Sequence, residues 1–142
     1  MRTAVYTEPI ARTPAEVWEF LTDRRNDVRW RREIVDVELI EGDPRVPGAR
    51  YREIVEWEGI KSKVELTVPE TSPGKRVVIL SDDPGYRTRS VWTFEPQGET
   101  TLVTLSFSFE ATGALSLAEP LLWKLVSRWL ERDLPLLEGH LG

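Results

Sequence analysis

Residues 116–138 read SLAEPLLWKLVSRWLERDLPLLE, and the remainder of the chain is most simply explained as the packing partner of this segment. Its apolar side chains recur at the three- and four-residue spacing of one helix face, at Ala118, Leu121, Leu122, Leu125, Val126, Trp129, Leu130 and Leu134. A helix of this length spans about 35 Å, the width of a small domain. Trp123, Leu130 and Leu134 widen the apolar stripe. The sequence therefore predicts a long helix around which other elements wrap.

Capping residues and prolines set the expected ends of this helix. Ser116 and Glu119 match a capping box. Pro120 lies near the first turn, where its missing N–H costs least, and Pro135 should kink or end the helix near Leu134.

Seven segments with strand character precede the helix, at residues 2–10, 35–39, 50–58, 60–68, 76–81, 86–95 and 101–111. Short turns that contain glycine or proline join most of them, which favours antiparallel pairing. Between the first two segments, Thr13, Pro14 and Glu16 mark the start of a short helix that should run to about Leu21. Residues 22–32 are polar and basic and should form a loop.

This order predicts an α+β fold in one domain covering residues 1–142. A curved antiparallel sheet of six to seven strands would wrap around the long C-terminal helix, with a short helix after the first strand.

Composition excludes several kinds of site. The 142 residues carry a net charge of −5, no cysteine and one histidine, so disulfides, thiolate sites and histidine-rich metal sites are excluded, and we expect no metal or cofactor. No basic stripe is present, which argues against a nucleic-acid partner. No leader or membrane-length apolar run is present, so we expect a cytoplasmic protein without stable membrane insertion, as a monomer or homodimer.

Several motifs together resemble a known family. They are Ile10 followed by Thr13, Pro14, Ala15, Glu16, Val17 and Trp18, then Leu21, Thr22 and Asp23, then Trp30, and a loop that ends in Pro47 and Gly48. With the run of hairpins and the terminal helix, the chain resembles the START and pollen-allergen-like (SRPBCC) superfamily, in its polyketide cyclase/dehydrase and lipid-transport branch. The resemblance implies a helix-grip fold with a deep cavity between the sheet and the last helix. Members bind lipids, sterols, polyketides or other apolar molecules, and some catalyse cyclisation or dehydration. The superfamily has no universal catalytic motif, so no catalytic residue is implied.

Strand alternation predicts which side chains face the long helix. They are Tyr51, Glu53, Val55 and Trp57; Ile60, Ser62, Val64, Leu66 and Val68; Tyr86, Thr88, Ser90, Trp92 and Phe94; and Val103, Leu105, Phe107 and Phe109. Segment 76–81 is apolar on both faces, so its inward face stays open. A mostly apolar cavity with a few polar groups is typical of a small-molecule site, although the same residues could also fill a solid core.

Glu53 is the one charged residue that we place on a confidently assigned inner face. A buried, unpaired carboxylate raises its pKa, and Glu53 could then donate a proton or bind a ligand hydroxyl. Alternatively, Glu53 reaches water near a strand end or pairs with an arginine such as Arg32 or Arg50.

A basic cluster surrounds Trp30. It consists of Arg24, Arg25, Arg29, Arg31 and Arg32, and it could form a gate for an anionic ligand. The simpler interpretation, which we favour, is a solvated loop balanced by Asp23, Asp27 and Glu33. We expect Trp30 to be exposed on this loop and to close the cavity mouth.

Three functions remain open. The first is a binding or carrier protein for a lipid or polyketide-like molecule, with ligand contacts from Trp30, Tyr51, Trp57, Trp92, Phe107, Phe109, Leu122, Leu125 and Trp129, and with Ser62, Ser90 and Glu53 orienting the ligand. The second is a cyclase or dehydratase in which Glu53 or Tyr51 moves a proton. The third is an interaction module with a filled core.

Overall fold

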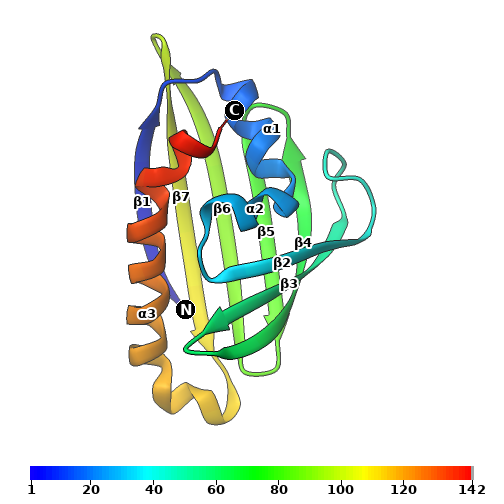
Figure 1. Cartoon of the computed structure of the whole chain (residues 1–142), viewed down its shortest axis with the longest axis vertical. Helices are drawn as coiled ribbons and strands as arrows, with labels where there is room; N and C mark the ends of the chain where they lie inside the picture. Colours follow the sequence, from blue (N-terminus) through cyan, green and yellow to red (C-terminus); the bar gives the residue numbers. More distant parts are fainter. Residues whose placement is uncertain (142) are drawn as a thin grey trace.

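The computed structural model describes residues 1–141 and contains seven strands and a set of α- and 3₁₀-helices (Figure 1). In chain order the elements are β1 (Arg2–Ile10), α1 (Pro14–Thr22), η1 (Arg24–Asn26), α2 (Asp27–Trp30), β2 (Ile34–Glu41), β3 (Ala49–Trp57), β4 (Ile60–Ser72), β5 (Arg76–Asp83), β6 (Tyr86–Gln97), β7 (Thr100–Ala111), η2 (Gly113–Ala118), α3 (Glu119–Asp133) and η3 (Leu134–His140), where η denotes a 3₁₀-helix.

All seven strands form one antiparallel sheet with the order β1-β7-β6-β5-β4-β3-β2. The sheet is open, with β1 and β2 at its two edges. Consecutive strands from β2 to β7 are neighbours, as the short turns predict. The β3–β4 hairpin turns at Glu58 and Gly59, which both have positive φ angles, of 50° and 78°, as in the tightest hairpin turns.

The sheet is strongly curved, and β2 and β3 run across the direction of β6 and β7 (Figure 1). Irregular pairing between Thr67 and Glu70 lies where β4 meets β5, and such bulges increase bending. On β5, Val77 and Ile79 face the core cluster and Leu80 is exposed, which resolves the face that the sequence leaves open.

The C-terminal helix is shorter than predicted. The single helix expected over residues 116–138 is instead a 3₁₀-helix, the α-helix Glu119–Asp133, and a second 3₁₀-helix. The expected Ser116–Glu119 capping box is wrong, because the Ser116 hydroxyl donates to the Gly113 carbonyl and Glu119 accepts the Ala111 N–H. Pro135 follows the end of α3, as predicted, because proline has no N–H for the next helical hydrogen bond.

The sheet wraps α3 less completely than expected. Within α3, Leu130 and Asp133 are buried, whereas Leu121 is 69% exposed. Trp123 stacks on Phe107 with ring centroids 6.2 Å apart, so α3 lies along the β7 and β1 side of the sheet (Figure 1). Part of the concave face is therefore not packed against α3, and a cavity lies between the two.

The segment between β1 and β2 is more ordered than a loop. The Thr13 hydroxyl accepts the Glu16 N–H at 3.2 Å, and the Glu16 carboxylate accepts the Thr13 N–H, so the predicted capping box starts α1. Val17 and Leu21 are fully buried on the core side of α1. The short helices η1 and α2 continue from α1 and place buried side chains, including Trp30, against the sheet.

Candidate ligand-binding cavity

A cavity of about 300 Å³ lies between the concave face of the sheet and α3, and this volume is at the lower end of the range for small-molecule sites. Its apolar wall comes from the strands β2, β3, β4, β5 and β7, from η2 and from α3. The wall residues are Ile34, Val55, Trp57, Ile60, Val64, Leu66, Ile79, Phe107, Phe109, Leu115, Leu122, Leu125, Val126 and Trp129.

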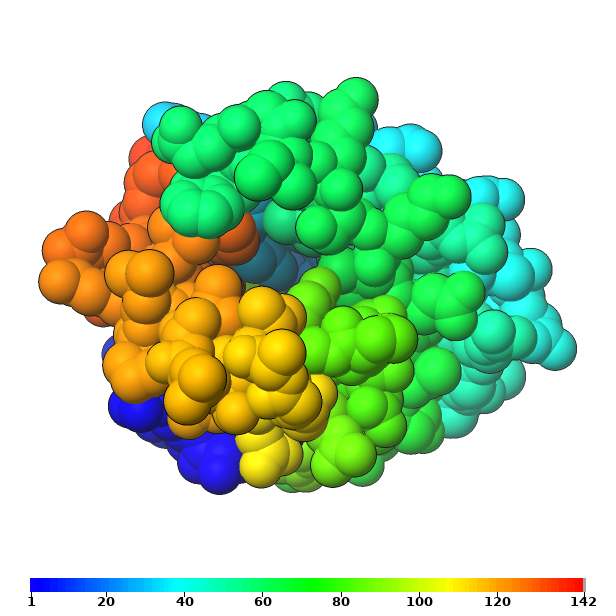
Figure 2. Space-filling model, turned by 90° about the horizontal axis from the view of Figure 1, so that it is seen from below, coloured from blue at the N-terminus to red at the C-terminus, as the bar shows by residue number. Residues whose placement is uncertain are grey.

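The mouth of the cavity has an apolar rim. Figure 2 shows a hollow between the β3–β4 hairpin, the end of β5 and β6, and the segment of η2 and early α3. Trp57, Ile60 and Leu115 line the cavity there and remain 44%, 64% and 42% exposed. Large apolar side chains are thus exposed around an opening that leads inwards.

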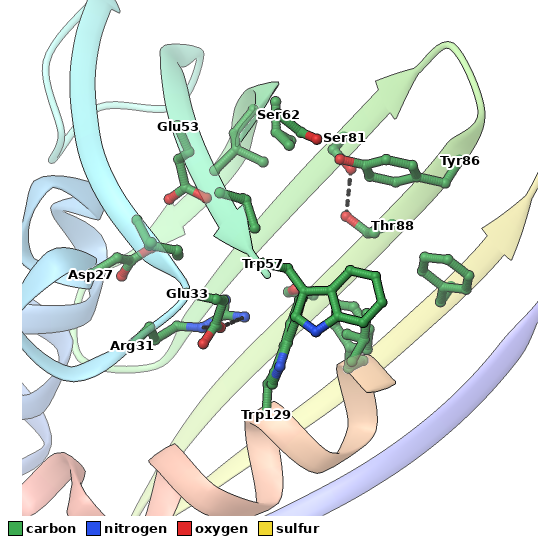
Figure 3. Close-up of a pocket in the computed structure, with 18 of the residues that line it drawn as sticks. Asp27, Arg31, Glu33, Glu53, Trp57, Ser62, Ser81, Tyr86, Thr88 and Trp129 are labelled. Atoms are coloured by element: carbon green, nitrogen blue, oxygen red, sulfur yellow. Dashed lines mark hydrogen bonds and ion pairs between the residues drawn. The ribbon is translucent and has the colours of Figure 1, made fainter. Parts of the chain in front are cut away.

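Small hydroxyl groups lie along the middle of the cavity. Ser62 and Ser90 line it, and the hydroxyls of Ser81 and Thr88 are hydrogen bonded at 2.6 Å (Figure 3). Burial, with a smaller contribution from the charge of Asp83, raises the pKa of Tyr86 to about 12. The Tyr86 phenol therefore stays neutral near pH 7 and can both donate and accept a hydrogen bond.

Glu53 lies at the inner part of the cavity. It occupies the middle of β3, opposite Val37 and Val64 in the sheet register, and it is 5% exposed. Burial raises the pKa of Glu53 well above its usual value, and the charge and hydrogen bond of the Asp27 carboxyl group raise it further. Arg24 and Arg31 oppose these effects only in part. The inward orientation predicted from alternation is therefore correct, and Arg32 and Arg50 are not its partners.

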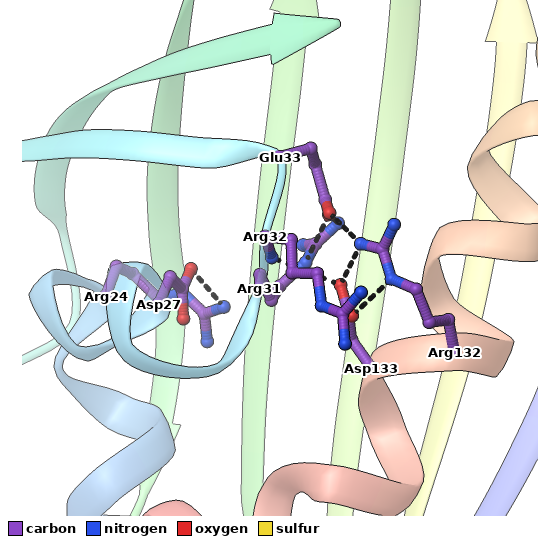
Figure 4. A network of polar contacts seen from close by, with 7 residues as sticks. All are labelled: Arg24, Asp27, Arg31, Arg32, Glu33, Arg132 and Asp133. Carbon is purple, nitrogen blue, oxygen red and sulfur yellow. Dashed lines mark hydrogen bonds and ion pairs between the residues drawn. The ribbon is translucent and has the colours of Figure 1, made fainter.

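A network of ion pairs surrounds the inner end of the cavity (Figure 4). Arg24 pairs with Asp27 at 2.6 Å, and both side chains are almost completely buried, at 3% and 1% exposure. The favoured interpretation of a solvated basic loop is therefore wrong for Arg24, because the turn formed by η1 and α2 directs it inwards. Asp27 is nevertheless its partner, as expected.

Glu33 joins this network to the last helix. It pairs with Arg31 at 2.7 Å and with Arg132 at 2.9 Å, and Arg132 also pairs with Asp133 at 2.6 Å (Figure 4). The backbone N–H of Arg32 donates to Asp133. These contacts fix the end of α3 against the segment that carries the inner wall of the cavity.

The structure brings most of the predicted ligand-contacting residues together around the cavity and places three of them outside it. The residues that line the cavity are Glu53, Trp57, Ser62, Ser90, Phe107, Phe109, Leu122, Leu125 and Trp129. Trp30, Tyr51 and Trp92 are buried in the core outside its lining.

Trp30 is not an exposed gate. It is 3% exposed and packs edge-to-face on Trp92 with ring centroids 6.0 Å apart, because α2 turns its last residue towards the sheet.

Tyr51 lies beside Asp23. Burial, and to a smaller extent the charge of Asp23, raises the pKa of Tyr51 to about 12.

From the sequence we favoured a solvated loop for four charged residues that the structure places in the cavity wall, which are Arg24, Asp27, Arg31 and Glu33. The spacing of Arg24 and Asp27 at i and i+3, which suits an ion pair on a helical turn, was the available signal. Among residues 1–141, no group of three or more histidine, aspartate and glutamate side chains is placed to hold a metal ion. No helix in the same residues is long and apolar enough to cross a membrane.

Comparison with known proteins gives one family match. The model of a family described as "Polyketide cyclase / dehydrase and lipid transport" matches residues 1–140. A search of curated proteins gave no match.

Solved structures share the architecture. A START superfamily protein from Mycobacterium smegmatis is 17% identical with a TM-score of 0.81, over 98% of this chain and 96% of that chain. A conserved protein from Geobacillus kaustophilus is 19% identical with a TM-score of 0.78, over 99% of this chain and 95% of that chain. The Zhui aromatase/cyclase from Streptomyces sp. R1128 is 16% identical with a TM-score of 0.77, over 99% of this chain and 90% of that chain. At these identities the likeness shows the fold alone, and it confirms the predicted helix-grip arrangement.

Proposed function

The chain belongs to the polyketide cyclase/dehydrase and lipid transport family, whose START-like domains are of the hydrophobic-ligand-binding kind, and we propose that it binds and carries a hydrophobic small molecule. The observation that carries this proposal is the cavity of about 300 Å³ under α3, with its largely apolar wall and apolar mouth. Removing an apolar molecule from water into such a wall is favourable in proportion to the apolar area covered.

The arrangement of side chains supports a specific orientation for the ligand. Aromatic side chains, among them Trp57, Phe107 and Trp129, supply contact area along the cavity. Ser62 and Ser90 offer hydrogen bonds in the middle, and Glu53 offers one at the inner end. A largely apolar molecule with its polar group leading inwards matches this order.

Native mass spectrometry of the protein as purified from cells tests the carrier proposal. We expect a co-purifying small molecule that organic extraction releases. The variant Ser90→Phe should lose it, because the new ring projects into the cavity. Ser106→Phe is the matched control, because Ser106 faces away from the cavity in the neighbouring strand β7. Equal occupancy of both variants would contradict the proposed site.

A second candidate function is a cyclase or dehydratase activity, and the buried acid Glu53 favours it. A neutral carboxyl group inside an apolar cavity can protonate a carbonyl or hydroxyl oxygen of a bound chain. Tyr51, the other predicted proton donor, lies outside the cavity lining. Turnover of linear poly-β-ketone analogues by the wild type, lost in Glu53→Gln at unchanged binding, would support this activity over a carrier.

The third possibility, an interaction module with a filled core, has less support. It requires packed side chains where the described residues leave a cavity.

A further inference from the structure

The charges at the inner end of the cavity are balanced without Glu53. Arg24 is in an ion pair with Asp27, Arg31 with Glu33, and Arg132 with Glu33 and Asp133. Each arginine thus has a carboxylate partner other than Glu53. An ionised Glu53 would be an additional buried negative charge with no partner of its own, which is costly, so the Glu53 carboxyl group is neutral.

Two buried oxygen atoms show where the proton of Glu53 points. Among the described residues, neither Glu53 Oε2 nor Asp27 Oδ1 has a hydrogen-bond donor, and Asp27 already accepts from Arg24 through its other oxygen, Oδ2. Figure 3 shows the two carboxyl groups at the same corner of the cavity. A proton on Glu53 that is donated to Asp27 satisfies both atoms, whereas two ionised carboxylates would leave both unpaired.

This arrangement determines what Glu53 offers to a bound molecule. A protonated carboxyl group has a single O–H donor, and here Asp27 receives it. Glu53 also lines the cavity, so its remaining lone pairs are available there as acceptors. The complementary ligand group is a donor, such as a hydroxyl. A carboxylate only accepts, and an ammonium group would be an additional buried charge, because the carboxylates there already pair with arginines.

We infer that the cavity takes an uncharged, largely apolar molecule with a hydroxyl group, which donates a hydrogen bond to Glu53 while Glu53 donates to Asp27. This inference rests on the proposed function and specifies the class of ligand. It makes Glu53 an acceptor towards the ligand, which differs from the proton-donor role that the cyclase or dehydratase candidate requires.

Three probes with the same ring system test the inference: 2-naphthol, 2-methoxynaphthalene and 2-naphthoate. Isothermal titration calorimetry at pH 7 gives the Kd of each for the wild-type protein. We expect 2-naphthol to bind about tenfold more tightly than the ether, because the ether leaves a buried acceptor unpaired. The carboxylate should bind most weakly of the three.

Two variants separate the hydrogen bond from the shape of the ligand. Glu53→Gln should keep the preference for 2-naphthol, because its amide N–H₂ can donate to Asp27 while its carbonyl accepts from the hydroxyl. Glu53→Leu should remove the preference and still bind the ether. Circular dichroism checks that both variants fold, and if the leucine variant does not fold, the wild-type series alone decides.

The possible failures are distinct. Equal binding of the naphthol and the ether, or tightest binding of the carboxylate, overturns the inference and leaves a carrier of apolar molecules. Binding of none of the three probes overturns the inference and the proposed function together.

Discussion

Glu53 combines an inward position on β3 with a carboxyl group that has a raised pKa, and this makes stability depend on pH. Burial raises the pKa of Glu53 in the folded protein, so Glu53 keeps its proton at pH values above 4.5, where the carboxyl group in the unfolded chain, with its ordinary pKa of 4.5, has lost it. The unfolded state therefore binds fewer protons, and the free energy of unfolding falls as pH rises. The contribution is fully present below about pH 4.5 and is lost as pH rises towards the pKa of the folded state.

Glu53→Gln should remove this pH dependence, because glutamine does not titrate. We expect the variant to gain stability relative to the wild type as pH rises above 4.5. The gain should be up to about 1.4 kcal/mol per pH unit, until the pH reaches the pKa of Glu53 in the folded protein. Urea unfolding from pH 4 to pH 8 measures the difference. A difference that does not change with pH would show that Glu53 is ionised in the folded protein.

Arg24 is the second residue with a specific expectation. Arg24→Met should destabilise the protein by about 3–5 kcal/mol, because it leaves the buried Asp27 carboxylate unpaired. Arg25→Met, at the neighbouring residue, is the matched control. Its pair with Asp23 is partly exposed, so it should cost under about 1 kcal/mol. Urea midpoints of the two variants compare them, and similar losses would contradict the buried pair.

Sequence alone could predict the inward face of Glu53 because strand alternation has a fixed period of two. It could not predict that Arg24 and Trp30 are buried. They lie on one-turn helices, which are too short for a periodic apolar pattern, and their burial depends on a tertiary contact with the sheet. Asp27 is part of the site for the same reason, and only the folded chain places it beside Glu53.

At the scale of elements, the two apparent capping boxes differ. Thr13→Ala should cost about 1 kcal/mol, because the Thr13 hydroxyl accepts the Glu16 N–H at the start of α1. Thr13→Ser should restore most of this. Ser116→Ala should cost less than Thr13→Ala, because Ser116 caps no helix. Thermal unfolding ranks the variants, and a larger loss for Ser116→Ala would reverse this assignment.

The sheet was more predictable than the last helix. Turn residues such as Gly59 have conformations that few other residues adopt easily, so the sequence places the hairpins well. The beginning of α3 depends instead on Glu119, whose side chain reaches the Ala111 N–H at the end of β7. This contact between β7 and α3 takes the place of the local capping box, and a periodic pattern in the sequence does not indicate such a contact.

For the whole molecule, an occupied cavity should raise stability by mass action. At a free concentration one hundred times its Kd, 2-naphthol should raise the free energy of unfolding by about 2.7 kcal/mol. Ser90→Phe should show no such increase, whereas Ser106→Phe should behave as the wild type does. Urea unfolding with and without the probe measures this, and an equal gain in both variants would place the bound molecule elsewhere.

The mouth is apolar and the inner end is charged, and this order affects how a guest is exchanged. A molecule that leads with its hydroxyl must strip water from that group while passing Trp57 and Ile60, before Glu53 can replace the lost hydrogen bonds. The hydroxyl group therefore lacks hydrogen bonds during the passage, both when the ligand enters the cavity and when it leaves. Residence time is then governed by the passage and not by affinity alone, so two guests with the same Kd can differ in how quickly they are delivered.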